Sequence, residues 1–150
     1  MSAARPGYPA NPILRDAARY RHWESERVRW SDTDQIGHVN NLAFAAYCET
    51  GRSQFMNQVT MQNRAIGRLF VVSQLIVNFH EELHWPAEVR VGNGVLDIGR
   101  TSYRIGQGLF EGERCFGSSE ALLVQIDATT RRPSPIGDEL RAWLETFRIG

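Results

Sequence analysis

The sequence predicts an α+β fold, in which a curved antiparallel five-stranded sheet wraps around one long central helix and a short helix follows at the C-terminus. Three observations support this prediction. One long stretch has the apolar spacing of a helix, four strand-like stretches follow it, and the connections between those strands are short enough to favour antiparallel neighbours. The 150 residues are one ordinary domain in length, and 42% hydrophobic with 23% charged residues is typical of a globular protein.

The N-terminal segment differs from the rest of the chain. We predict that residues 1–20 form a partly ordered arm and that residues 21–150 form a single domain. Three prolines prevent a continuous helix or central strand in the arm: Pro6, Pro9 and Pro12. After the last of them, the arm could form a short helical turn that packs on the domain.

A strand and a turn are predicted before the central helix. Residues 26–30 alternate polar and apolar side chains, with Val28 and Trp30 on one face, which favours a strand. Residues 31–37 are dense in turn-forming residues. The helix is predicted over residues 39–55, because one stripe of its surface gathers five apolar or small residues: Phe44, Tyr47, Cys48, Gly51 and Phe55.

Four strands and a short helix are predicted for the rest of the chain. The strands are rich in branched and aromatic residues and cover residues 69–80, 88–98, 102–110 and 114–127. A turn-rich stretch follows, and the C-terminal helix has four apolar positions: Leu140, Trp143, Leu144 and Phe147. Because one helix cannot cover both faces of five strands, we expect subunits to pair through the sheet, as a homodimer or a homotetramer.

Composition excludes several classes of function. Acidic and basic residues balance at 17 each, which argues against a general nucleic-acid binder. The chain has no Lys, so Schiff-base chemistry and a Lys-bearing phosphate loop are excluded. No apolar run is long enough for a transmembrane helix, and Met1 to Pro12 lack a secretion signal. We therefore expect a cytoplasmic protein without a membrane partner, in which Cys48 and Cys115 are buried free thiols.

The richest candidate site is the segment 32–41, Asp-Thr-Asp-Gln-Ile-Gly-His-Val-Asn-Asn, where the first strand leads into the helix. A helix start exposes unpaired backbone N–H groups and the positive end of the helix dipole, which together can hold an oxyanion. A carboxylate just before it can attack a carbonyl group or deprotonate a water molecule. The structural alternative is that Asp and Asn serve here only as caps and turn residues.

This segment, with Trp30, Tyr47, Glu49 and Arg52 around it, resembles the hotdog-fold acyl-CoA thioesterases of the 4-hydroxybenzoyl-CoA thioesterase type, in their Gly-His-Val-Asn-Asn branch. The similarity is strongest at the motif, continues more weakly from about residue 27 to 143, and does not cover the arm. It implies hydrolysis of an acyl-CoA to a free acid and CoA, without a metal or redox cofactor. Phe44 departs from the pattern, because the family usually has Tyr there.

The resemblance implies a role for each motif residue. Asp34 matches the catalytic carboxylate, as a nucleophile or as a general base, and the sequence does not choose between them. Gly37 permits close approach of the thioester, and the backbone N–H near Asn41 matches the oxyanion donor. His38 could orient Asp34 or the substrate, or be structural. Glu49 is the reserve carboxylate, because another hotdog branch draws its acid from the helix; otherwise we expect it to pair with Arg52.

The neighbouring Asp32 is predicted to be structural, capping the turn or pairing with an arginine. Contacts with CoA are harder to identify. The weak candidates are Ser73, Thr101, Ser102, Arg131 and Arg132, chosen because arginines bind phosphates and because residues 99–102 resemble a family segment near the pantetheine arm. The acyl group itself cannot be identified from one sequence.

A rival motif lies at residues 80–84, His-Glu-Glu-Leu-His, which fits the zinc-protease pattern H-E-x-x-H. That chemistry needs a helix, whereas the preceding residues are strand-like and Pro86 follows closely, so no metal site is expected. Two other functions stay open. A hotdog dehydratase acting on a hydroxyacyl thioester would use a His–acid pair, and an acyl-CoA-binding module would bind without turnover.

Overall fold

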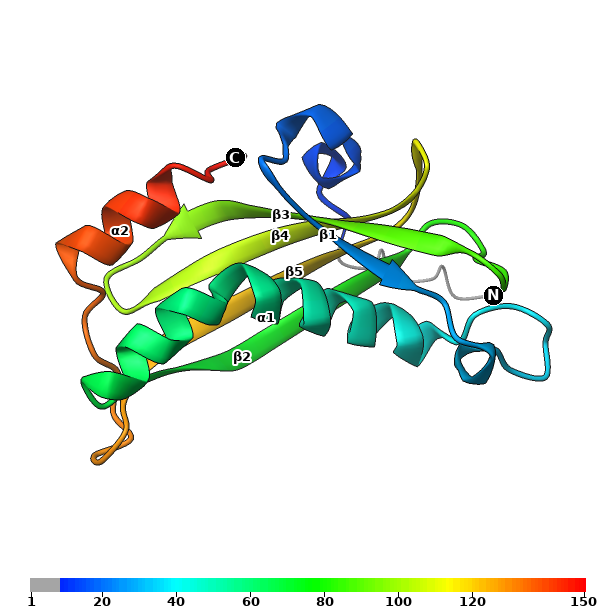
Figure 1. The fold of residues 1–150 in the computed structure, drawn as a ribbon. Coiled ribbons are helices and arrows are strands. Elements are labelled where there is room, and N and C mark those ends of the chain that lie inside the picture. The colour runs from blue at the N-terminus through cyan, green and yellow to red at the C-terminus, as the bar shows by residue number, and fades with distance from the viewer. Residues whose placement is uncertain (1–8) are drawn as a thin grey trace, which may run out of the picture.

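The structure, a computed structural model, describes residues 9–150. It contains one antiparallel sheet of five strands, in the order β1-β3-β4-β5-β2, wrapped around one helix (Figure 1). The strands are β1 (His22–Arg27), β2 (Arg68–Phe79), β3 (Glu88–Ile98), β4 (Ser102–Glu111) and β5 (Arg114–Asp127). The helices are α1 (Asn41–Ala65) and α2 (Asp138–Glu145). The predicted fold class is thereby confirmed, including the short C-terminal helix.

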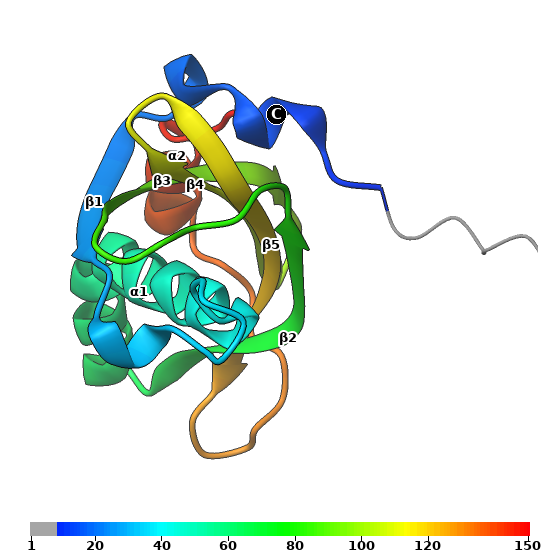
Figure 2. The same ribbon diagram turned by 90° about the vertical axis from the view of Figure 1, so that its right-hand side faces the viewer.

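The sheet curls so that α1 lies against its concave face, which the end-on view shows clearly (Figure 2). Three register shifts accompany the curvature. They interrupt the pairing of β2 with β5 at Val72/Gln74, of β3 with β4 at Val95/Asp97, and of β4 with β5 at Leu109/Phe110. Such bulges bend a strand and increase its twist. The two outer strands, β1 and β2, each have one hydrogen-bonding edge that no strand of residues 9–150 occupies.

Two element boundaries differ from the prediction. The first strand covers His22–Arg27 instead of 26–30, because Trp30–Asp32 forms the 3-10 helix η3, in which the Arg29 backbone N–H donates to Asp32 Oδ2 at 2.9 Å. Helix α1 extends to Ala65, well beyond residue 55. In its second half, Met56 and Val59 are buried against the sheet. Most of the residues around them are polar, so the apolar spacing of this half is hard to recognise in the sequence.

Residues 9–20 of the predicted arm pack on the convex side of the sheet. They form two 3-10 helices, η1 (Pro12–Arg15) and η2 (Ala17–Arg19). η1 contacts both β4 and β5, and its Leu14 is fully buried. A Cβ atom on Gly108 would lie 2.6 Å from the Leu14 carbonyl oxygen, so glycine permits this contact. Pro6 and the rest of residues 1–8 lie outside the described part of the chain.

The concave core consists of two hydrophobic clusters along α1 with a polar belt between them. One cluster surrounds Phe44 and the other surrounds Phe55. In the belt, buried Gln107 donates to the Cys48 carbonyl oxygen at 2.9 Å and to Asn93 Oδ1 at 2.7 Å. Both cysteines are buried free thiols, as predicted. None of the helices in residues 9–150 has the length and hydropathy needed to span a membrane.

Candidate active site

The segment between β1 and α1 folds into a tight loop around Asp34. The Asp34 backbone N–H donates to the His38 carbonyl oxygen at 3.1 Å, and the Gly37 N–H donates to the Asp34 carbonyl oxygen at 3.1 Å. Gly37 has φ of 96°, a left-handed conformation that favours glycine. The Asp34 side chain also accepts a hydrogen bond, at 2.9 Å, from the Ile36 backbone N–H. The loop therefore fixes the carboxylate by its own backbone.

Asp34 faces a cavity of about 460 Å³ at the N-terminal end of α1. The loop, the start of α1 and the end of β2 line this cavity, through Asp34, Ile36, His38, Val39, Asn41, Phe44, Phe79, His80, Glu81 and Glu82. Among residues 9–150, no cation lies within 4 Å of the Asp34 carboxylate. One carboxylate oxygen is therefore left available for chemistry at the cavity.

The start of α1 brings backbone donors to the same cavity. Asn40 is the N-cap, and its side-chain oxygen accepts from the Leu42 N–H at 2.8 Å. Asn41 is the first helical residue, so its N–H has no acceptor within the helix. Because Asn41 lines the cavity together with Asp34, a carboxylate and an unpaired helix-terminal donor lie at one site.

Asp32, in contrast, is a structural residue, as predicted for it. Its Oδ2 accepts from the Tyr47 hydroxyl at 2.7 Å and from the Arg29 backbone N–H, while its carbonyl oxygen accepts from the Asn40 N–H at 2.8 Å. It thus ties the loop to the second turn of α1. Burial, followed by the bond to Asp32, raises the pKa of Tyr47, which keeps this phenol protonated.

The H-E-x-x-H segment holds the Asp34 loop in place. The Val39 N–H donates to the carbonyl oxygen of buried Leu83 at 2.7 Å, and His84 Nδ1 donates to the Gly37 carbonyl oxygen at 3.2 Å. Glu82 lies beside both histidines, 3.4 Å from His84 Nε2 and 3.9 Å from His38 Nε2. Residues 80–84 contain no helix, which confirms that the segment lacks the zinc-protease geometry.

His80 follows β2 at the edge of the cavity. Its Nε2 lies 2.9 Å from Ser118 Oγ. Burial lowers the pKa of His80, the nearby Arg15 cation lowers it further, and Glu81 opposes both effects. The lowered pKa favours the neutral imidazole, and His80 lines the same cavity as Asp34. Sequence reasoning missed His80 and Phe79 as cavity residues, because they are far from the motif in the chain and the H-E-x-x-H pattern directed attention to metal binding.

The predicted pair of Glu49 with Arg52 is wrong. Glu49 is exposed on α1 and does not line the Asp34 cavity. Arg52 is only 7% exposed and points toward the sheet, where Nη1 donates to Gln107 Oε1 at 3.5 Å. The two residues are three positions apart, but Arg52 lies on the side of α1 that faces the sheet, whereas Glu49 lies on the exposed side. The reserve carboxylate is thus not placed at this cavity within one chain.

The five weak CoA candidates do not lie beside Asp34 in the single chain. Ser73 is at the bulge in the middle of β2, where its hydroxyl donates to the Leu122 carbonyl oxygen at 3.4 Å. Ser102 pairs with Val124 on β5, whereas Phe79 at the cavity pairs with Gly117, so the two places are about 23 Å apart along β5. Thr101, Arg131 and Arg132 are at the same distant end.

Comparisons with known proteins show the family and the fold of this chain. The family model described as the thioesterase-like superfamily matches residues 28–144. The uncharacterized protein YsmA of Bacillus subtilis (strain 168) is 24% identical over 137 residues, which cover 89% of this chain and 92% of YsmA. The PA2801 protein of Pseudomonas aeruginosa is 26% identical with a TM-score of 0.75, covering 83% of this chain and 98% of that one. DHNA-CoA thioesterase from Staphylococcus aureus is 19% identical with a TM-score of 0.72, covering 83% and 87% of the two chains.

Proposed function

The chain belongs to the thioesterase-like superfamily, and from this premise we propose that it is an acyl-CoA thioesterase of the hotdog fold, in the Gly-His-Val-Asn-Asn branch of the 4-hydroxybenzoyl-CoA thioesterase type. It would hydrolyse an acyl-CoA to the free acid and CoA. One observation carries the proposal: the carboxylate of Asp34 and the first free N–H of α1, at Asn41, line the same cavity.

The chemistry requires an electrophile held by the helix and an acid beside it. The thioester carbonyl oxygen accepts from the Asn41 N–H, which stabilises the negative charge that develops on that oxygen. As a general base, Asp34 takes a proton from water, the water oxygen bonds to the acyl carbon, the C–S bond breaks, and the CoA thiolate receives the proton. As a nucleophile, Asp34 forms an acyl anhydride with release of CoA, and water then hydrolyses it.

The loop residues support either route. Gly37 has no side chain, and the place that a Cβ atom would take is open, with no atom within 4 Å of it. The substrate can therefore approach the backbone of the loop. His38 lines the cavity with its Nδ1 3.5 Å from the Val39 carbonyl oxygen. We propose that His38 orients the substrate and that the contacts of Leu83 and His84 with the loop keep Asp34 in position.

We further propose that the active form is a homodimer joined along the free edge of β2. This strand exposes four large hydrophobic side chains, which is unusual for a monomer: Val71, Val72, Leu75 and Phe79. An edge of 12 residues is also a template for pairing with another chain. Antiparallel pairing of two β2 strands around a twofold axis near Ser73 would cover these side chains.

Such a dimer gives a role to the distant CoA candidates. Antiparallel pairing places the start of one β2 beside the end of the other. The turn that follows β5 lies at the start of β2, where the Ala128 N–H donates to the Gly67 carbonyl oxygen at 2.8 Å. The partner's Arg131 and the partner's Arg132 would then lie near the Asp34 cavity, where exposed guanidinium groups can bind the CoA phosphates.

The test is hydrolysis by Asp34→Asn compared with Glu49→Gln, measured as free thiol released from a panel of acyl-CoA esters with short, aromatic and long acyl groups. We expect Asp34→Asn to keep the fold and to lose about 10²- to 10⁴-fold in kcat, because an amide neither attacks nor accepts the proton. Glu49→Gln should keep its activity. The opposite ranking would move the chemistry to the helix.

The same assay separates the rival functions. Thiol release distinguishes a thioesterase from a dehydratase, which leaves the thioester intact. Tight binding of acyl-CoA without turnover by the unmodified protein, across the whole panel, would identify a binding module instead.

A further inference from the structure

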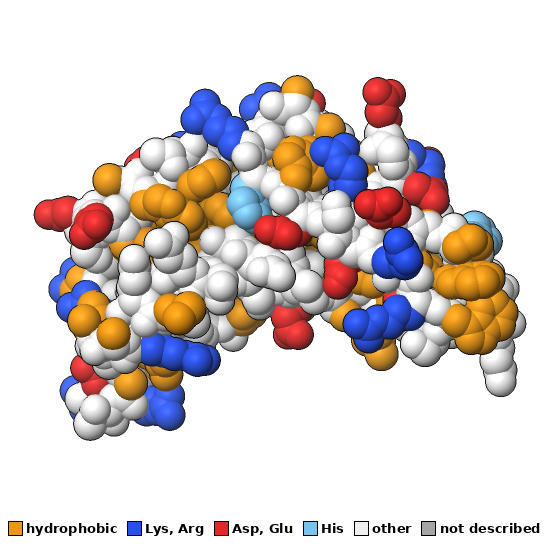
Figure 3. All heavy atoms as spheres, viewed as in Figure 1, with side chains coloured by type: hydrophobic (Ala, Val, Ile, Leu, Met, Phe, Trp, Pro, Cys, Tyr) orange, Lys and Arg blue, Asp and Glu red, His pale blue; other side chains and the backbone are white. Residues whose placement is uncertain are grey.

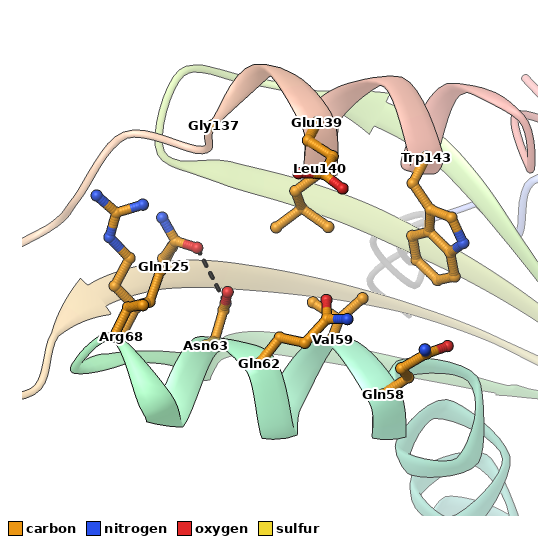
Figure 4. A pocket seen from close by; sticks show the side chains of 11 residues that line it. Gln58, Val59, Gln62, Asn63, Arg68, Gln125, Gly137, Glu139, Leu140 and Trp143 are labelled. Carbon is orange, nitrogen blue, oxygen red and sulfur yellow. Dashed lines mark hydrogen bonds between the residues drawn. The ribbon is translucent and has the colours of Figure 1, made fainter.

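A second cavity lies at the other end of α1. Its volume is about 540 Å³, within the range of small-molecule sites. Its walls are the second half of α1, the start of β2, the end of β5, and α2 (Figure 4). It shares no lining residue with the Asp34 cavity, and the 25 residues of α1 separate the two ends by about 37 Å. Within one chain, therefore, the residues assigned to the hydrolysis lie outside it.

The floor of this cavity is a fixed pair of amides. Asn63 on α1 is 8% exposed and donates through Nδ2 to Gln125 Oε1 at 3.0 Å. Gln125 is 1% exposed, and its Nε2 donates to the carbonyl oxygens of Ser134 at 3.3 Å and Pro135 at 2.8 Å. Among residues 9–150, Asn63 Oδ1 accepts no hydrogen bond. A polar atom that faces a cavity without a protein partner can accept a hydrogen bond from a ligand or from a water molecule.

Arg68 supplies the only cation of the lining, at one end of the cavity (Figure 4). Its cross-strand neighbour is Asp127, but Oδ1 of that carboxylate accepts from the Thr129 and Thr130 N–H groups at 2.9 and 2.8 Å. No acidic side chain of residues 9–150 lies within 4 Å of the Arg68 guanidinium. A half-buried guanidinium with free donors favours a carboxylate.

The other end of the cavity is apolar and aromatic. Trp143 and Leu140 of α2 point down toward Val59 of α1 (Figure 4). Trp143 is held from behind by aromatic packing, with its ring centroid 5.1 Å from Phe55 and 5.0 Å from Phe147. In the space-filling view, hydrophobic side chains gather along α2 in the same region (Figure 3). This end suits a flat apolar group.

Glu139 limits the charge of the ligand. This carboxylate lies on the α2 side of the cavity and is exposed at its rim. It repels a second negative charge, which disfavours diphosphates and dicarboxylates, and it accepts a hydrogen bond from an O–H or N–H group. Gln58 and Gln62 offer amide groups from the opposite wall.

We propose that this cavity is a second ligand site, for an organic monocarboxylate with a flat apolar body that carries a hydrogen-bond donor. The carboxylate pairs with Arg68, the flat body lies against Leu140 and Trp143, and the donor faces Glu139 or the glutamines. All the residues of this site come from one chain, so the proposal does not depend on the thioesterase assignment, and each can fail without the other.

The probe is indole-3-propionate, which has one carboxylate, a flat body and an N–H group, with indole-3-propionamide as its neutral counterpart. Binding is measured by isothermal titration calorimetry on the full chain. We expect saturable binding of the acid, and at least about tenfold weaker binding of the amide, because the charge-assisted bonds to Arg68 are lost.

Two arginine variants locate the site. Arg68→Gln should weaken binding of the acid about tenfold, whereas Arg64→Gln, which changes an exposed arginine outside the cavity in the last turn of α1, should not. Thermal melts check that both variants fold. Asp34→Asn should bind the probe like the unmodified chain. The proposal is overturned if the acid does not bind, if acid and amide bind equally, if both arginine variants behave alike, or if Asp34→Asn abolishes binding.

Discussion

Two acids of one motif, Asp32 and Asp34, have different environments. Asp32 Oδ2 accepts hydrogen bonds from the Tyr47 hydroxyl and from the Arg29 backbone N–H, and these bonds connect the loop to α1. Asp34 accepts one loop N–H and faces a cavity. Both residues are aspartates, two positions apart, so residue type alone does not distinguish Asp32, which stabilises the loop, from Asp34, which the loop positions.

Removal of the Tyr47 hydroxyl tests the structural role of Asp32. Tyr47→Phe deletes a bond to a carboxylate and should lower the free energy of unfolding by about 1.5 kcal/mol. It should also lower kcat, because the loop that carries Asp34 loosens. The control is Tyr20→Phe, which deletes the bond of a buried hydroxyl to the Leu14 carbonyl oxygen on the convex side of the sheet. Denaturant unfolding should detect a loss in both variants, but only Tyr47→Phe should slow turnover; equal activities would contradict the positioning role.

His22 predicts how stability depends on pH. Asn93 Nδ2 is a donor 3.1 Å from His22 Nδ1, so that nitrogen must accept and the ring must be neutral. Burial lowers the pKa of His22 from its ordinary value of 6.5, while Glu24 opposes this shift. The unfolded chain therefore binds the proton more readily. The stabilisation is fully present above pH 6.5 and is lost as the pH falls through the lowered pKa of the folded state.

Melting temperatures measured from pH 7.5 to pH 5 should therefore decrease, and His22→Gln should reduce that decrease. His80→Gln is the companion variant, because burial lowers the pKa of His80 as well. If His22→Gln showed the full decrease of the unmodified chain, the neutral state of His22 in the fold would be wrong.

At the scale of elements, the fit of α1 against the sheet depends on one small residue. A Cβ atom on Gly51 would lie 2.6 Å from Cγ1 of buried Val91 on β3. Alanine favours a helix over glycine by about 1 kcal/mol, whereas overpacking a core costs about 1–3 kcal/mol. Val91 is β-branched and has little freedom to turn away, so the steric cost should win.

Gly51→Ala should thus lower the free energy of unfolding by about 1–2 kcal/mol, measured with urea. Ser53→Ala changes an exposed position of the same helix and should leave stability equal or slightly higher. A stabilised Gly51→Ala protein would show that α1 can move away from β3 at little cost.

At the scale of the whole molecule, assembly is predicted by the edge of β2 that no strand of residues 9–150 occupies. Leu75 is 44% exposed in the middle of that strand. Leu75→Arg should convert the proposed dimer into a folded monomer, because a guanidinium would be buried without a partner at the interface. Hydrolysis should fall at least about tenfold if the partner supplies charge-assisted contacts to CoA.

Light scattering after size-exclusion chromatography measures the mass directly. The control, Ala142→Arg, places the same side chain at an exposed position of α2, away from β2, and should keep the mass of the unmodified chain. A monomeric unmodified chain with full activity, or a Leu75→Arg dimer, would each contradict pairing through β2.

Local spacing was enough to predict the element order, the long helix and the place of the candidate site: the apolar stripe of α1 and the Asp-x-Asp-x-x-Gly-His-Val-Asn-Asn run. The end of α1 and the start of β1 were misplaced, since packing overrides local preference there. Only the tertiary structure turned Arg52 inward to Gln107, brought Phe79 and His80 to Asp34, and opened a second cavity between α1 and α2. Each of these features depends on contacts between residues that are far apart in the chain. The curvature of the sheet decides which distant residues come into contact, and no short segment of the sequence encodes that curvature.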